Sequence, residues 1–182
     1  TEIEYECDTL LLSCGLLPEN ELSRAAGVDI NPITNGPRVN ESLETSVPGI
    51  FAAGNVLHVH DLVDFVSEEA AAAGRSAAAY IRENRQIGGK SLPITGIGGV
   101  RYTVPTTIRP DALEPGPTAV IRFRVDDVYT NKQIVVLAGN KVIFRKKRHV
   151  LAPGEMETLK LKADELLACP GAERITVRLE DA

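Results

Sequence analysis

The sequence has little cysteine and no long hydrophobic run, and each absence excludes a class of protein. No stretch approaches the roughly eighteen apolar residues that a membrane-spanning helix needs. The three cysteines form no CxxC pair and match no zinc spacing, so we expect neither a disulfide framework nor a zinc site. The acidic N-terminus also lacks the basic and apolar regions of a signal peptide. We therefore expect a cytoplasmic protein with reduced thiols and no membrane span.

The first half of the chain has the pattern of α/β structure. Apolar residues alternate and then run continuously over residues 3–12, which predicts a strand that becomes buried on both faces. "GIFAAG" at 49–54 predicts a second buried strand. The alanine-rich stretch that follows predicts a long helix over 62–84. A short helix is expected within residues 19–30, with Gly27 as its stop.

The second half has the pattern of a β protein. Residues 87–99 contain five glycines and a proline, which predicts a linker. From residue 100 to residue 182, short β-rich runs alternate with turn sequences, and "ADELLAC" at 163–169 is the one helical segment. This spacing predicts a small antiparallel sandwich. The turn, strand and short helix expected in "LAPGEMETLKLKADELL" at 151–167 suggest an immunoglobulin-like one.

Charge is distributed unevenly between these halves. Residues 1–89 carry 14 acidic and 5 basic side chains, whereas residues 90–182 carry 11 and 15. This asymmetry indicates two units with different surfaces. The run "RKKRHV" at 145–150 is expected to be a charged strand edge, and few aromatic residues accompany it, so we expect no nucleic-acid partner. The helix charges Glu68 or Glu69, together with Arg75, are expected on a solvated face.

Polar residues gather directly after the second predicted strand, and three interpretations stay open for them. His58 and His60 lie two residues apart, on one face if the segment is extended. With Asp61 or Asp64 they could ligate a metal, but no further ligand stands at a suitable spacing, so no metal is predicted. A histidine paired with Asp61 could instead act in acid–base catalysis. The third interpretation is a loop that packs or bonds to backbone.

The strand end itself is a candidate cofactor site. Ligands of α/β sheets lie beyond the carboxyl ends of strands, where a glycine such as Gly54 lets the backbone approach closely. Asn55 could hydrogen-bond a hydroxyl group. The amides at the start of the next helix, around Val63 to Val66, would face an electron-rich group.

Three segments in this order resemble the C-terminal portion of the pyridine nucleotide-disulfide oxidoreductases, which are FAD- and NAD(P)-dependent enzymes. They are "CDTLLLSCGLLPENEL", "NGPRVNESLETSVPGIFAAGNV" and "EEAAAAGRSAAAYI", and the resemblance covers residues 1–86. It implies a Rossmann-like part of an FAD-binding region, followed by the linker at 87–99 and an all-β sandwich at 100–182.

The resemblance also implies roles for individual residues. The family's Gly-Asp, which places a carboxylate on the ribityl chain of FAD, corresponds to Gly54 and Asn55, where an amide replaces the carboxylate. The implied cofactor-binding residues are Gly54, Asn55, Val56, Asp64, Phe65 and Val66. The implied substrate-side residues, which are the catalytic candidates, are His58, His60 and Asp61.

Other parts of the family pattern are absent. The sequence has no GxGxxG for FAD or NAD(P), no CxxC dithiol and no initiator Met. We therefore expect the C-terminal fragment of a longer flavoenzyme that moves electrons between NAD(P)H, FAD and an acceptor, with the isolated chain not competent alone. The alternative is a non-catalytic module whose β domain docks a partner subunit or a second copy in a homo-oligomer.

Overall fold

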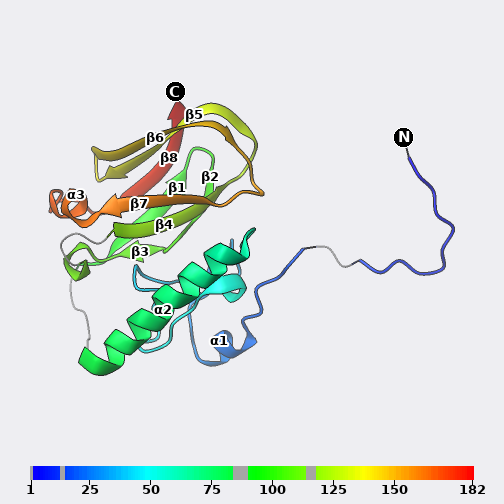
Figure 1. Cartoon of the computed structure of the whole chain (residues 1–182), viewed down its shortest axis with the longest axis horizontal. Coiled ribbons are helices and arrows are strands. Elements are labelled where there is room, and N and C mark those ends of the chain that lie inside the picture. The colour runs from blue at the N-terminus through cyan, green and yellow to red at the C-terminus, as the bar shows by residue number, and fades with distance from the viewer. Residues whose placement is uncertain (1, 13–14, 84–89, 114–117) are drawn as a thin grey trace.

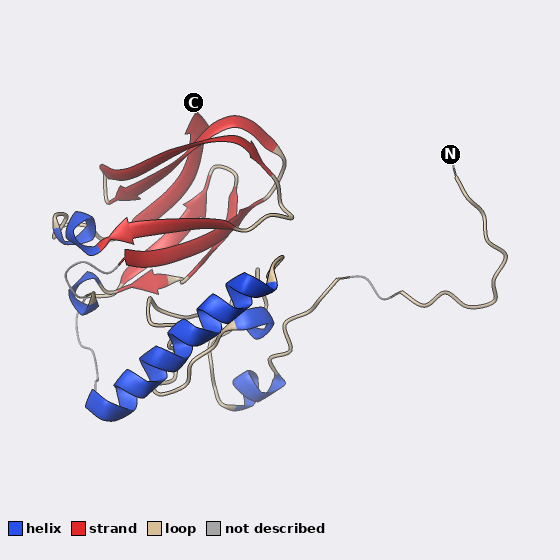
Figure 2. Cartoon of the chain, in the orientation of Figure 1, coloured by secondary structure: helices blue, strands red, loops and turns tan. Residues whose placement is uncertain are grey.

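The computed structural model describes residues 2–12, 15–83, 90–113 and 118–182 (Figure 1). In these residues, eight strands form two sheets, and the long helix α2 (Val63–Glu83) crosses below the smaller sheet in the view of Figure 1. Figure 2 shows the strands gathered in one part of the molecule. In the chain they all follow α2, which is preceded by loops and by the short helices α1 and η1. None of the described helices is both long and apolar enough to cross a membrane.

The two sheets differ in size and pairing. The larger has the order β3 (Thr107–Ile108), β1 (Leu92–Ile97), β8 (Ile175–Asp181), β5 (Tyr129–Ala138) and β6 (Lys141–Leu151). The smaller has the order β2 (Val100–Val104), β4 (Thr118–Val125) and β7 (Glu157–Lys162). The short helices are α1 (Glu21–Ala25), η1 (Gly54–Val56), η2 (Pro110–Ala112) and α3 (Ala163–Leu167).

The prediction of two β-sheets is confirmed, but the pairing is not wholly antiparallel. Strands β1 and β8 run parallel, with Ile94 opposite Ile175. A parallel pair needs a long connection, and here the whole β2-to-β7 segment supplies it. The immunoglobulin-like arrangement, in which both sheets are antiparallel, is therefore not confirmed.

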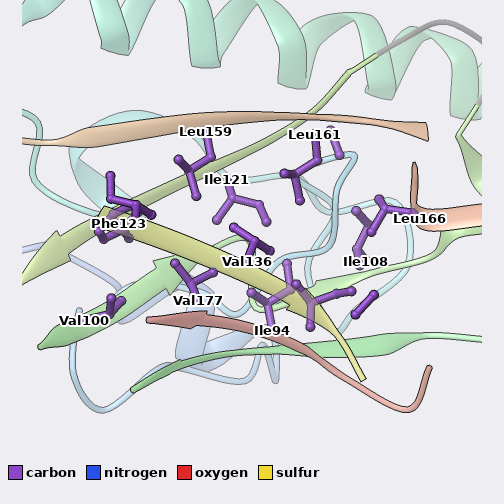
Figure 3. Packing of buried hydrophobic residues seen from close by; sticks show 14 of the residues in the cluster. Ile94, Val100, Ile108, Ile121, Phe123, Val136, Leu159, Leu161, Leu166 and Val177 are labelled. Carbon is purple, nitrogen blue, oxygen red and sulfur yellow. The ribbon is translucent and has the colours of Figure 1, made fainter. Parts of the chain in front are cut away.

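The main core lies between the two sheets, and it forms because every second side chain of a strand points to the same face of its sheet. Along β4, Ile121 and Phe123 are fully buried and point toward the larger sheet (Figure 3), whereas Arg122, between them, points to the opposite face. Leu159 and Leu161 of β7 complete the same layer. The other face of the small sheet is thus left to meet α2 and its neighbouring loops.

The two halves of the chain are joined by hydrogen bonds. The Thr106 backbone amide donates to the Val39 carbonyl at 2.9 Å. The Glu41 carboxylate accepts from the backbone amide and the Nε of Arg109 at 2.9 and 3.0 Å. A second core cluster includes Ala73 of α2 and Val104 of β2. The β-sheet half therefore packs directly against the first half.

The helices agree well with the sequence patterns. The helix expected over 62–84 is α2, and residue 84 lies outside the described residues. Helix α1 ends just before Gly27, whose φ of +77° is the left-handed conformation typical of a helix stop. Helix α3 also lies where the sequence predicts it.

Two strand predictions in the first half are wrong. No strand forms in the described residues 2–12; Ile3 is 74% and Leu11 88% exposed, because no described strand pairs with this segment. Within 49–54 the backbone makes only an isolated bridge between Glu44 and Phe51. Apolar character alone does not make a strand when the hydrogen-bonding partner is missing.

The segment predicted as a linker, 87–99, contains a strand. Residues 87–89 lie outside the described residues, but 92–97 form β1. Leu92 and Ile94 are buried in the main core, which explains why this stretch is ordered into the sheet. Gly98 and Gly99, both with positive φ, form the turn into β2.

Candidate functional site

The candidate site begins where the chain turns at Gly54. Ala52 is buried and hydrogen-bonds to the Leu43 carbonyl, and the 3₁₀ helix η1 follows at once. Gly54 adopts φ +74°, a conformation that glycine takes without strain. A Cβ at this position would come within 3.3 Å of Val66 Cγ1, so the turn also lies close against the start of α2.

Glu69, on the second turn of α2, lies at the centre of the site and is fully buried. Its Oε1 accepts hydrogen bonds from the Gly54 amide at 2.8 Å and from His60 Nε2 at 3.0 Å. Its Oε2 accepts from His58 Nε2 at 3.0 Å and from Arg122 Nη1 at 3.3 Å. We call Gly54, His58, His60, Glu69 and Arg122 the Glu69 cluster. It satisfies a buried carboxylate with four donors.

The hydrogen bonds to Glu69 define the protonation of the two imidazoles. Both rings must carry a proton on Nε2 in order to donate to the carboxylate. Each Nδ1 is buried and has no hydrogen-bond partner among the described residues. The rings of His58 and His60 meet edge to face with centroids 4.3 Å apart. A proton on Nδ1 of either ring would be a buried donor without a partner among these residues.

The pKa values of the cluster follow from burial and from these contacts. Burial acts to raise the pKa of Glu69, but the hydrogen bonds from His58 and His60 and the nearby charge outweigh it and lower the pKa to about 2. Burial lowers the pKa of His58, and the charge of Arg122 adds to this effect against the opposing attraction of Glu69. The cluster therefore holds an ionised Glu69 beside a neutral His58 at neutral pH.

The structure adds Glu69 to the two histidines as a third possible metal ligand, but the surroundings of these residues do not suit a metal ion. The ligand atoms of His58, His60 and Glu69 lie within 4.8 Å of one another, all buried. A metal on both Nε2 atoms would place a proton on each Nδ1, and metal-bound histidines normally donate that proton to an acceptor. No such acceptor exists among the described residues, and the Arg122 cation already contacts Glu69. The geometry fits a hydrogen-bonded cluster better than a metal centre.

The other residues predicted for catalysis or cofactor binding lie around the cluster, outside it. Asp61 is turned toward the β half, where its Oδ1 lies 3.4 Å from Arg124 Nη2 and its Oδ2 accepts from the Met156 amide at 3.4 Å. Asn55 is exposed, and its Oδ1 accepts from the His60 amide at 3.1 Å. The structure thus brings the two histidines together but separates Asp61 from them.

The remaining predicted cofactor residues line the start of α2 and the turn before it. Val56 is half-buried, and its carbonyl accepts a hydrogen bond from Asn20 Nδ2 at 2.8 Å. Asp64 is exposed, while Phe65 and Val66 are half-buried on the side of α2 that packs inward. These residues border one edge of the Gly54 turn.

Sequence reasoning missed the two charged members of the cluster. The expectation of a solvated face for Glu68 or Glu69 holds for Glu68, whose side chain is 69% exposed, and is wrong for the buried Glu69. A signal was present, because Glu69 lies four residues from Phe65 and from Ala73, within the stripe that α2 buries. Arg122 gave a similar signal as a charge between the apolar Ile121 and Phe123 of a strand, but its partner on α2 could not be identified from the strand alone.

Comparison with known proteins adds evidence of ancestry. The profile described as "Pyridine nucleotide-disulphide oxidoreductase" matches residues 1–78. Residues 1–78 are therefore similar to this family. The match covers the Gly54 turn and all of the Glu69 cluster except Arg122, so the site lies largely inside the family segment. No solved structure shows a significant match to the chain.

Several curated oxidoreductases are also similar to the chain. An NADH oxidase of Methanocaldococcus jannaschii is 26% identical over 182 residues, covering 97% of this chain and 38% of the relative. An NAD(P)H sulfur oxidoreductase (CoA-dependent) of Pyrococcus furiosus is 30% identical over 102 residues, covering 55% of this chain and 22% of the relative. An NAD(P)H coenzyme A polysulfide/persulfide reductase of Pyrococcus horikoshii is 31% identical over 102 residues, which again cover 55% of this chain and 22% of the relative. The chain thus spans well under half the length of these relatives.

Proposed function

We propose that this chain forms the C-terminal part of an FAD-dependent NAD(P)H oxidoreductase, and that the Gly54 turn and the start of α2 form one edge of its flavin site. The similarity of residues 1–78 to the pyridine nucleotide-disulphide oxidoreductases and the oxidoreductase activities named for the relatives support this proposal. When bound, the flavin would take electrons from NAD(P)H and pass them to an acceptor. The observation that carries the proposal is the Gly54 turn held against α2 by Glu69.

The residues at this edge fit a flavin. Gly54 keeps the turn free of a side chain, and the exposed Asn55 carboxamide offers a donor to a ribityl hydroxyl. The first-turn amides of α2 have no partners within the helix, and they favour negative charge on a reduced ring. Leu62 and Val63, 54% and 75% exposed, offer apolar surface beside them.

The chain's own residues would orient the cofactor and keep this edge rigid. Glu69 binds the Gly54 amide and both histidines, so that the turn and α2 move as one body. Arg122 extends this connection to β4. We infer that the β half supports the flavin edge, since it packs on the cluster itself. His58 and His60 serve as positioning residues, because their Nε2–H groups are engaged by Glu69.

A nuclear magnetic resonance titration of the chain with flavin mononucleotide tests this proposal. We expect the amide signals of Asn55 and of residues 63–66 to shift. ADP serves as the control and should leave them in place, because the sequence contains no GxGxxG to hold the ADP half of FAD. Unshifted signals with flavin mononucleotide, or equal shifts with ADP, would contradict a flavin edge at this turn.

A further inference from the structure

A cleft of about 510 Å³ lies between α2 and the outer face of the small sheet, next to the Glu69 cluster, and Glu69 and Arg122 also line it. Ala72 and Arg75 of α2 line one wall, and Val120, Thr158 and Lys160 of β4 and β7 line the other. Further apolar surface comes from Leu43, Val104, Pro105 and Leu113. The cleft has the size of a small-molecule site and combines apolar walls with a few polar groups.

Every carboxylate that lines this cleft already has a cationic partner. Glu41 accepts hydrogen bonds from Arg109. Glu68 lies 3.6 Å from Arg122 Nη2, and Glu69 is satisfied by its four donors. Glu68 and Glu69 share the single cation of Arg122, so the three carboxylates keep one net negative charge, which the two further cations of the cleft, Arg75 and Lys160, exceed.

Some of the cationic and hydrogen-bond donor groups that line the cleft have no ion-pair or hydrogen-bond partner among the described residues. Arg75 and Lys160 stand on opposite walls, and neither forms an ion pair within the described part of the chain. Thr158 Oγ1 and Arg122 Nε are buried and have no hydrogen-bond partner there. Thr158 lies directly opposite Arg122 in the β4–β7 pairing, and Lys160 follows two residues later on the same face. Buried donors without partners mark a place where a bound acceptor would be stabilising.

We propose that this cleft binds a small organic acid. Its carboxylate lies between Lys160 and Arg75 and accepts from Thr158, while its apolar body packs against Leu43 and Val120. The charge balance selects the ligand, because the unmatched groups are two cations and a hydroxyl. A neutral ligand of the same shape forgoes the charged hydrogen bonds, and a cationic one is repelled.

The test compares three small aromatic probes that differ in charge: benzoate, benzamide and benzylammonium. Each is titrated into the ¹⁵N-labelled chain while the amide signals of the cleft are followed. We expect benzoate to shift the signals of Ala72, Val120 and Lys160. Benzamide and benzylammonium should bind at least about tenfold more weakly, since they lose the charged hydrogen bonds. Equal binding of benzoate and benzamide, or no shift with benzoate, would overturn the proposal.

Variants locate the site without relying on the flavin proposal. Lys160→Met and Arg75→Met should each weaken benzoate binding several-fold, and the double variant should remove the preference over benzamide. Arg82→Met is the matched control, because Arg82 is an exposed cation on the same helix but outside the cleft. Benzoate binding that survives the double variant, or that Arg82→Met weakens equally, would contradict the assignment. No flavin enters this experiment, so its failure is separate from failure of the proposed function.

Discussion

At the scale of single residues, Glu69 determines the character of the site. It is a fully buried carboxylate on a helix, and it contacts the backbone of the Gly54 turn, two imidazoles and a guanidinium. Removing one partner of a buried charge pair is much more damaging than removing an exposed one, because the remaining charge stays desolvated. This residue therefore offers a clear contrast with its neighbour Glu68, whose side chain is 69% exposed.

We predict that Glu69→Gln lowers the free energy of unfolding by about 3 kcal/mol, because Arg122 loses its buried counter-charge and the new amide group opposes an imidazole N–H. Glu68→Gln, the matched control, should lower it by less than about 1 kcal/mol, since its ion pair is exposed to solvent. Urea denaturation of both variants measures the difference. Similar small losses in both would mean that the Glu69 cluster contributes little to stability.

The protonation of the cluster predicts how stability depends on pH. The folded-state pKa of His58 is below its ordinary 6.5, so its contribution is complete above about pH 6.5 and decreases as pH falls toward the lower folded value. The pKa of Glu69 falls from 4.5 to about 2, so a second loss begins below about pH 4.5 and continues to about pH 2. Both shifts have the same sign, and acid destabilises the fold in two stages.

Urea midpoints measured in steps from about pH 8 to about pH 4 test the first stage. We expect a decline that starts near pH 6.5 and that becomes shallower in His58→Gln, which has no imidazole at this position to protonate. A wild-type midpoint that stays constant between about pH 7 and about pH 5 would contradict a buried neutral His58.

At the scale of elements, the helices could be predicted from sequence more fully than the strands. The alanine-rich composition of α2 is a local property, and so are the glycine stop of α1 and the alternation within β4. A strand needs a partner elsewhere in the chain. The apolar run at residues 3–12 and "GIFAAG" lack a paired strand in the described residues, while β1 emerges from a segment that looked like a linker. Pairing between distant segments decides these cases, and composition does not reveal it.

The candidate site was predictable in its local features but not in its contacts between distant segments. The Gly54 turn and the two histidines stand out in one short stretch of sequence, and the structure places the histidines side by side. Arg122 lies fifty-three positions from Glu69 in sequence, so their contact depends on how β4 packs against α2. Asp61 illustrates the opposite error: it is close to the histidines in sequence but bonds to Arg124 instead.

At the scale of the whole molecule, the β half and the family segment form one packed unit. Arg109, Arg122 and Arg124, all from the β half, bond to Glu41, Glu69 and the Val59 carbonyl of the first half. The second core cluster also draws Val104 from β2 into contact with the first half. This arrangement supports the view that the β half holds the flavin edge in place, and it creates the cleft whose unmatched cations suggest a small organic acid.

The most direct test of the account is the affinity of flavin mononucleotide for Glu69→Gln, with Glu68→Gln as the control, at a temperature where both variants are folded. Glu69 is not among the residues proposed to touch the flavin, but it holds the Gly54 turn and the two histidines by hydrogen bonds, so its substitution reports on positioning. We predict that Glu69→Gln binds flavin mononucleotide about tenfold more weakly than the wild type, and that Glu68→Gln binds it equally well. Wild-type affinity in Glu69→Gln would contradict the claim that the Glu69 cluster positions a flavin site.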